Sequence, residues 1–80
     1  MKPVRFTRAS RKHRVGRASA RHVIATVLPE LTKDEETGAD LPSWIGEDER
    51  ARELEIIALD RPDCLVVIHV MPTHYRRNKP

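Results

Sequence analysis

A histidine interrupts the most apolar stretch of this sequence. His69 stands within residues 64–71, where most of the other side chains are Leu, Val or Ile. An imidazole ionises near neutral pH, so a histidine in a cleft can act as a general acid or base. The alternative is a core histidine bonded to the backbone, because buried polar groups are usually satisfied within the structure. We include His69 among the candidate catalytic residues and leave the alternative open.

A polar and basic cluster follows this stretch directly. Arginine can hold a phosphate through two parallel hydrogen bonds, tyrosine can stack on a base, and histidine or tyrosine can move a proton. These side chains suit metal-free cleavage of RNA, in which the 2′-hydroxyl is the nucleophile. We predict that His74, Tyr75 and Arg76 are catalytic residues and that Arg77 binds nucleic acid. The alternative is a basic tail that contacts nothing.

A second cationic cluster lies near the start of the chain. We predict that it binds RNA through Arg11, Lys12, His13 and Arg14. The alternative is a solvated face at the end of a helix, where cations interact favourably with the helix dipole. The nuclease hypothesis requires this cluster and residues 74–77 to converge around His69.

The sequence contains no motif that indicates another kind of chemistry. The four histidines and the single cysteine, Cys64, have no zinc-site spacing, and the three glycines are isolated, so there is no phosphate-binding loop. No Ser-His-Asp arrangement is legible either. We therefore expect neither a metal nor a cofactor.

Charge is segregated along the chain. Residues 1–24 carry eight cations and no acid, residues 25–60 carry eleven acids and three cations, and residues 61–80 carry four cations and one acid. Two basic ends indicate a surface for a polyanion if they meet in space. The alternative is that the basic ends neutralise the acidic middle.

The apolar residues fall into one helical pattern and three strand patterns. A stripe with helical spacing predicts a helix over about 17–28, formed by Ala20, Val23, Ile24, Val27, Leu28 and Leu31. Residues 8–13 have helical composition after the candidate N-cap Thr7. Residues 41–45 suit an edge strand, residues 53–59 alternate, and residues 64–71 predict a central strand with His69 on the face of Leu65, Val67 and Met71.

These elements predict a single small α+β domain over residues 1–80, in the order ααβββ. Two N-terminal helices would pack on a three-stranded antiparallel sheet. We expect Val4 and Phe6 to form a short strand or to anchor the segment in the core. Residues 32–40 are expected to form an acidic loop, and residues 73–80 a basic tail. The sequence has no run of 18 apolar residues that could span a membrane, and a single cysteine suits a reducing compartment. We therefore expect a cytoplasmic protein.

The order of elements resembles the BrnT-type toxins of the RelE-like class. The resemblance lies in residues 6–16, in the helix with Ala20 and Val23, and in the strand sequences of residues 44–46, 54–58 and 65–72. Lys12 and His13 match a Lys-His element of that family, and Arg76 falls near a basic residue after its last strand. Gly16 follows Val15, whereas the family has its glycine before the aliphatic residue, and we expect no C-terminal helix where many members carry one.

The resemblance implies the toxin of a toxin–antitoxin pair, an endoribonuclease that cleaves messenger RNA. It also implies a cognate antitoxin protein as partner and operator DNA bound through their complex; an oligomer is possible. Two other functions stay open from the residues alone. One is a small DNA-binding or regulatory module that uses residues 7–28 as a helix-turn-helix. The other is an interaction protein without activity.

Overall fold

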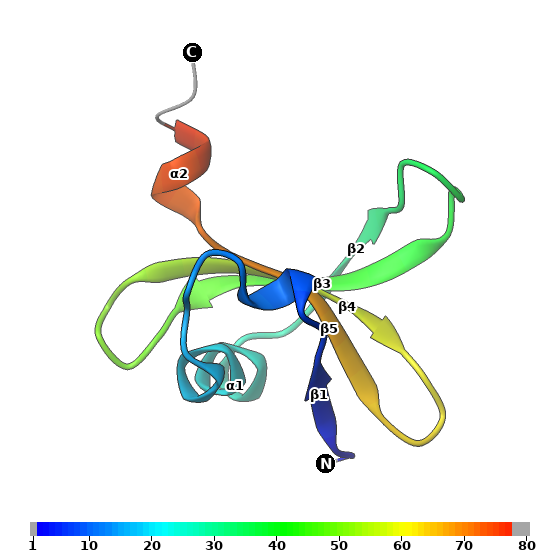
Figure 1. Ribbon diagram of the computed structural model, residues 1–80, viewed down its shortest axis with the longest axis horizontal. Helices are drawn as coiled ribbons and strands as arrows, with labels where there is room; N and C mark the ends of the chain where they lie inside the picture. Colours follow the sequence, from blue (N-terminus) through cyan, green and yellow to red (C-terminus); the bar gives the residue numbers. More distant parts are fainter. Residues whose placement is uncertain (1, 78–80) are drawn as a thin grey trace.

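A single twisted sheet of five strands forms the frame of the protein. The structure is a computed structural model that describes residues 2–77, with the backbone alone for Arg76 and Arg77. The strand order is β1-β5-β4-β3-β2 (Figure 1). The strands are β1 (Val4–Phe6), β2 (Glu30–Lys33), β3 (Asp40–Glu47), β4 (Glu53–Asp60) and β5 (Leu65–Pro72). The helices are the 3-10 turn η1 (Ala9–Arg11), α1 (Arg17–Thr26) and α2 (Thr73–Arg77).

The predicted ααβββ fold with a three-stranded antiparallel sheet is wrong. β1 pairs in parallel with residues 65–67 of β5, and β2 pairs antiparallel with β3, which makes the sheet five-stranded and mixed. Val4 and Phe6 therefore form a strand, and β4 is the middle strand of the sheet. Both added strands are only three or four residues long. Strand β1 depends on a partner that is distant in sequence, and β2 begins directly after Pro29. The local periodicity of the sequence therefore reveals neither strand.

The predicted first helix is reduced to one 3-10 turn. The Thr7 hydroxyl accepts the Ser10 N–H at 3.2 Å, and the Ser10 hydroxyl donates to the Thr7 carbonyl at 2.7 Å. Arg14 then takes a left-handed backbone conformation, with φ of 58°. A non-glycine residue in that region interrupts a right-handed helix. Residues 7–28 therefore contain a single α-helix, and the helix-turn-helix alternative loses its first helix.

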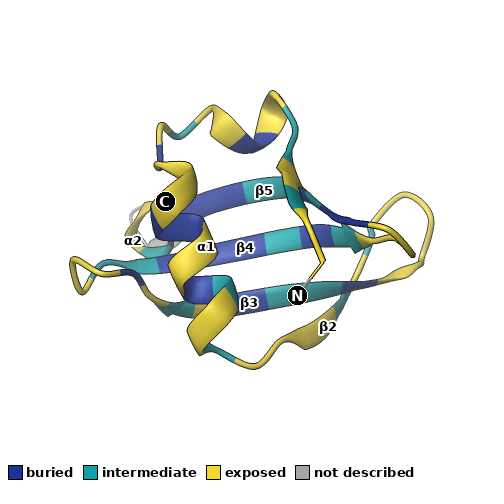
Figure 2. Ribbon diagram, turned by 90° about the horizontal axis from the view of Figure 1, so that it is seen from below, coloured by how far each residue is buried: buried dark blue, intermediate teal, exposed yellow. Residues whose placement is uncertain are grey.

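Helix α1 covers one face of the sheet, as predicted for residues 17–28 but two residues shorter. Val27 is already extended, with Pro29 two residues on. The helix buries Ala20 and Val23 against side chains from the three central strands (Figure 2). The members of this core include Trp44, Leu54, Ile56, Ala58, Leu65, Val67 and Val70. We call this side of the sheet the helix face.

A glycine in β3 sets how closely α1 approaches the sheet. A Cβ at Gly46 would overlap the Val27 Cγ2 methyl and touch Val23 Cγ1 at 3.5 Å. We expect Gly46→Ala to lower the free energy of unfolding by about 1–3 kcal/mol, because the overlap forces the helix outward. Urea denaturation measures the change. Gly16→Ala is the control, since nothing lies within 4 Å of a Cβ there; equal losses in both variants would contradict the close approach.

Two segments expected to be irregular contribute regular structure. Residues 32 and 33 of the predicted acidic loop belong to β2, which leaves residues 34–39 as the turn of the β2–β3 hairpin. As a result β3 is an internal strand and not the expected edge strand. Pro42 is accommodated in it opposite Leu31. Residues 73–77 of the predicted tail form α2.

A β-bulge places His69 on the face opposite Leu65 and Val67, with which it was predicted to share a face, whereas Met71 lies on the same face as His69, as predicted. Ile57 lies opposite His69 and Ala58 lies opposite Val67, so Ile68 has no residue opposite it. One extra residue reverses the alternation of side chains beyond it. His69 therefore lies on the side of the sheet away from α1, which we call the outer face, while Leu65 and Val67 lie on the helix face.

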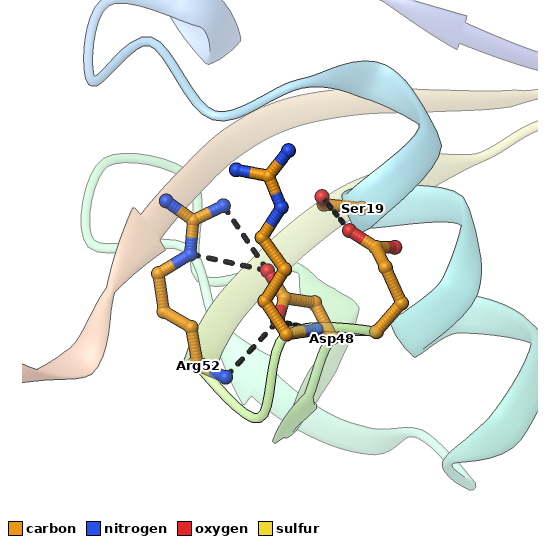
Figure 3. A network of polar contacts seen from close by, with 5 residues as sticks. Ser19, Asp48 and Arg52 are labelled. Atoms are coloured by element: carbon orange, nitrogen blue, oxygen red, sulfur yellow. Dashed lines mark hydrogen bonds and ion pairs between the residues drawn. The ribbon is translucent and has the colours of Figure 1, made fainter.

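The turn between β3 and β4 is organised by one buried carboxylate. Asp48 accepts the backbone N–H groups of Arg50 and Arg52 at 2.8 and 3.0 Å, and its side chain also contacts the Arg52 guanidinium (Figure 3). The hydroxyl of Ser19 in α1 donates to Glu49 of the same turn. Burial opposes ionisation of Asp48, but these hydrogen bonds and the Arg52 charge offset it, so the pKa of Asp48 lies below its ordinary value.

We expect Asp48→Ala to lower the free energy of unfolding by about 2 kcal/mol at neutral pH, because it leaves two part-buried N–H groups without an acceptor. Because the pKa of Asp48 is lower in the folded protein than in the unfolded chain, ionised Asp48 stabilises the fold. This contribution is fully present above the ordinary aspartate pKa and is lost as the pH falls. The difference between wild type and variant should therefore shrink as the pH falls below about 4. Thermal melts across the acid range measure it, with Asp63→Ala as an exposed control. A difference that grows toward acid would contradict the assigned role.

None of the helices within residues 2–77 has both the length and the apolar character needed to span a bilayer.

Candidate functional site

The candidate site begins with a paired imidazole and carboxylate on the outer face. His69 Nε2 lies 3.1 Å from Glu55 Oε1, on the neighbouring strand β4. An ionised carboxylate can only accept, so this hydrogen bond requires a proton on Nε2 and leaves Nδ1 of the neutral ring able to take another. The His69 side chain is 29% exposed and that of Glu55 is 9% exposed. His69 is thus oriented by a nearly buried partner while its ring stays accessible.

Two further rings come from distant parts of the chain. The His13 ring lies 6.3 Å from that of His69 and 5.5 Å from that of Tyr75, measured between centroids, with edge-to-face geometry in both pairs. His74 contacts Tyr75 in the same manner at 4.6 Å. The structure therefore brings together four side chains that the sequence singled out: His13, His69, His74 and Tyr75.

The fold explains why the N-terminal segment reaches the end of β5. β1 pairs only with residues 65–67, and η1 packs beside β5 further along. The loop after η1 then rises beside the base of α2 (Figure 1), and the left-handed residue Arg14 turns it back toward α1. His13 is thereby placed next to Tyr75.

Helix α2 is fixed at its first residue. The Thr73 hydroxyl donates to Glu53 Oε1, at the start of β4, at 2.7 Å. Pro72, opposite Leu54, ends β5 immediately before the helix. The direction of the tail, which the sequence left undefined, is thus set by a side-chain contact with the neighbouring strand.

Exposed cationic side chains flank His13, one of the four rings in this cluster. Arg11, Lys12 and Arg14 are exposed. Among the described residues, lysine and arginine form ion pairs at Lys2, Lys33 and Arg52, and none is found from Arg8 to Arg17. The predicted side chains of Arg76 and Arg77 lie outside the described part of the structure. Within residues 2–77, no group of three or more histidine, cysteine, aspartate or glutamate side chains could hold a metal ion.

Sequence reasoning missed Glu55 as a member of the site. In the sequence it is one residue of the alternating pattern over residues 53–59. A signal was present in the sequence, because Glu55 stands between Leu54 and Ile56 in a largely apolar segment. The structure buries all three side chains. Pairing it with His69 required the register of the β4–β5 hairpin, which the bulge at Ile68 displaces by one residue.

Comparison with protein-family models, with curated proteins and with solved structures gives no significant match for this chain. Its function is therefore inferred from its own residues and their arrangement.

Proposed function

We propose that this protein is an endoribonuclease that cleaves RNA with its own acid and base groups. One observation carries the proposal: the rings of His13, His69 and Tyr75 meet at the end of β5, where Glu55 orients His69. Two imidazoles at this separation can act on opposite sides of one phosphate. The adjoining cations supply sequence-independent attraction for the RNA backbone.

The reaction is a transesterification followed by release of two RNA ends. His69 Nδ1 removes the proton from the 2′-hydroxyl, whose oxygen then attacks the adjacent phosphorus. The bond from phosphorus to the 5′-oxygen breaks, and that oxygen takes a proton from His13. The products are a 2′,3′-cyclic phosphate and a 5′-hydroxyl. Tyr75, 41% exposed, offers a ring on which a base beside the scissile phosphate can stack.

The distribution of charge indicates the side from which RNA approaches. The exposed cations Arg8, Arg11, Lys12 and Arg14 lie from the N-terminal cap of η1 to the loop after it, and η1 packs beside β5. The turn of the β2–β3 hairpin, on the opposite edge of the sheet, carries Asp34, Glu35 and Glu36. A polyanion is attracted to the first edge and repelled from the second.

The resemblance to BrnT-type toxins supports a more specific biological role. We propose that messenger RNA is the substrate and that a cognate antitoxin inhibits the enzyme and represses their operon with it. Lys12 and His13, which carry the resemblance, lie next to or within the ring cluster. Growth arrest on induction, relieved by the product of a neighbouring small gene, tests this role.

Cleavage of a defined RNA oligonucleotide tests the activity. We expect products that end in a 2′,3′-cyclic phosphate, with no loss of rate in a chelator. A matched oligonucleotide with a 2′-deoxy sugar at the cleaved position should stay intact, because it lacks the nucleophile. Mass spectrometry identifies the ends. Cleavage of the deoxy oligonucleotide, or an intact RNA after incubation with folded protein, would refute the proposal.

A further inference from the structure

The outer face of the sheet carries a groove that the proposed reaction does not use. It has a volume of about 450 Å³ and an apolar floor formed by Leu41, Ile57 and Ile68. Residues 32–36 of the β2–β3 hairpin and Glu55 of β4 also line it. Figure 1 shows this hairpin turn and α2 projecting from the sheet, with α1 below it.

The charges around this groove are predominantly negative. Its lining includes four carboxylates, from Asp34, Glu35, Glu36 and Glu55, and a single cation, Lys33. That lysine is already paired, with its Nζ 2.7 Å from Asp40 Oδ1. The backbone N–H of Glu36 donates to Asp34 at 2.9 Å and lowers the pKa of Asp34, so Asp34 keeps its charge in mildly acidic solution.

We propose that this outer-face groove binds a basic amphipathic segment of a partner protein. Apolar side chains of the segment would cover Ile57 and Ile68, and its arginines or lysines would pair with Glu35 and Glu36. An RNA strand is disfavoured by the same carboxylates, and a neutral apolar segment would leave them unpaired. The complementarity therefore selects a cationic peptide.

The groove is coupled to the ring cluster through Glu55. This side chain lines the groove and also contacts His69 Nε2. An arginine that pairs with Glu55 competes for the oxygen that orients His69. Binding in the groove should therefore inhibit RNA cleavage; this consequence rests on the proposed function, whereas binding itself does not.

NMR titration of the whole protein with a short synthetic peptide that alternates arginine with leucine tests the binding. We expect saturable shifts in the methyl signals of Ile57, Ile68 and Leu41, with a Kd of about 100 µM or lower. A peptide with glutamate in place of arginine should give no saturation. Glu35→Lys should weaken binding about tenfold, and Asp63→Lys, in an exposed turn outside the groove, should leave it unchanged.

Several results would overturn the inference. These are equal binding of the two peptides, shifts centred on α1 and β1, equal weakening by both lysine variants, or shifts that depend on protein concentration without peptide and so reveal a second copy as occupant. The titration contains no RNA, so its outcome is separate from that of the cleavage assay. Bound peptide without measurable cleavage leaves this inference standing, and cleavage without peptide binding removes this inference alone.

Discussion

Replacing either His69 or His13 with glutamine is expected to reduce RNA cleavage about a hundredfold or more. Proton transfer by a positioned side chain contributes about 10²–10⁴-fold to a reaction rate. Glutamine keeps hydrogen-bonding capacity at a similar size but does not take or give a proton near neutral pH. Initial rates with a fluorescent RNA oligonucleotide measure the effect.

The control for this pair is His22→Gln. His22 is exposed on α1, on the opposite side of the sheet from His69, and we expect its replacement to leave the rate unchanged. Thermal melts of all three variants show whether the fold is retained. Folded His69 and His13 variants that cleave RNA at the wild-type rate would contradict the assigned roles.

Glu55→Gln provides a graded test of the same site. Loss of the partner that orients an acting group typically costs about 10–100-fold. We expect an intermediate rate, because His69 remains but its ring and tautomer are no longer fixed by a carboxylate.

Replacing Ile56 with alanine is expected to lower the free energy of unfolding by about 3 kcal/mol. Ile56 is fully buried on the helix face, where it lies opposite both Trp44 and Val70. The free energy of unfolding of a domain of this size is only about 4–12 kcal/mol, so the variant should be close to unfolding at body temperature.

The neighbouring variant Ile57→Ala is the matched control. Ile57 is half-buried on the outer face, opposite His69, so the same truncation should cost about 1 kcal/mol. Urea denaturation compares the two. Equal losses, or a larger loss at Ile57, would contradict the strand register and with it the position of His69.

The sequence indicated the residues of the candidate site more clearly than it indicated the fold that positions them. His69 stands out because it breaks an apolar run, and His13, His74 and Tyr75 stand out because of the cations beside them. The apolar stripe that predicted α1 was correct for Ala20, Val23 and Ile24, because a helix depends mainly on contacts within a few turns. Its last members, Leu28 and Leu31, lie beyond the helix and are exposed.

The sheet could not be predicted in the same way. β1 is held by a parallel pairing with β5, which follows it by about sixty positions, so no local pattern indicates it. The one-residue bulge at Ile68 has no signature in a run of β-branched residues, and it determines the face on which His69 lies. Helical composition over residues 8–13 was misleading because Arg14 adopts a left-handed conformation.

The central claim is that His13 and His69 contact the same stretch of RNA. The most direct measurement is NMR of the protein with labelled histidines, titrated with the uncleavable 2′-deoxy oligonucleotide. The imidazole signals of His13 and His69 are predicted to shift together and saturate at one RNA concentration, while the signal of His22 stays in place. Saturation with both imidazoles unmoved, or with His22 moving instead, would contradict the claim.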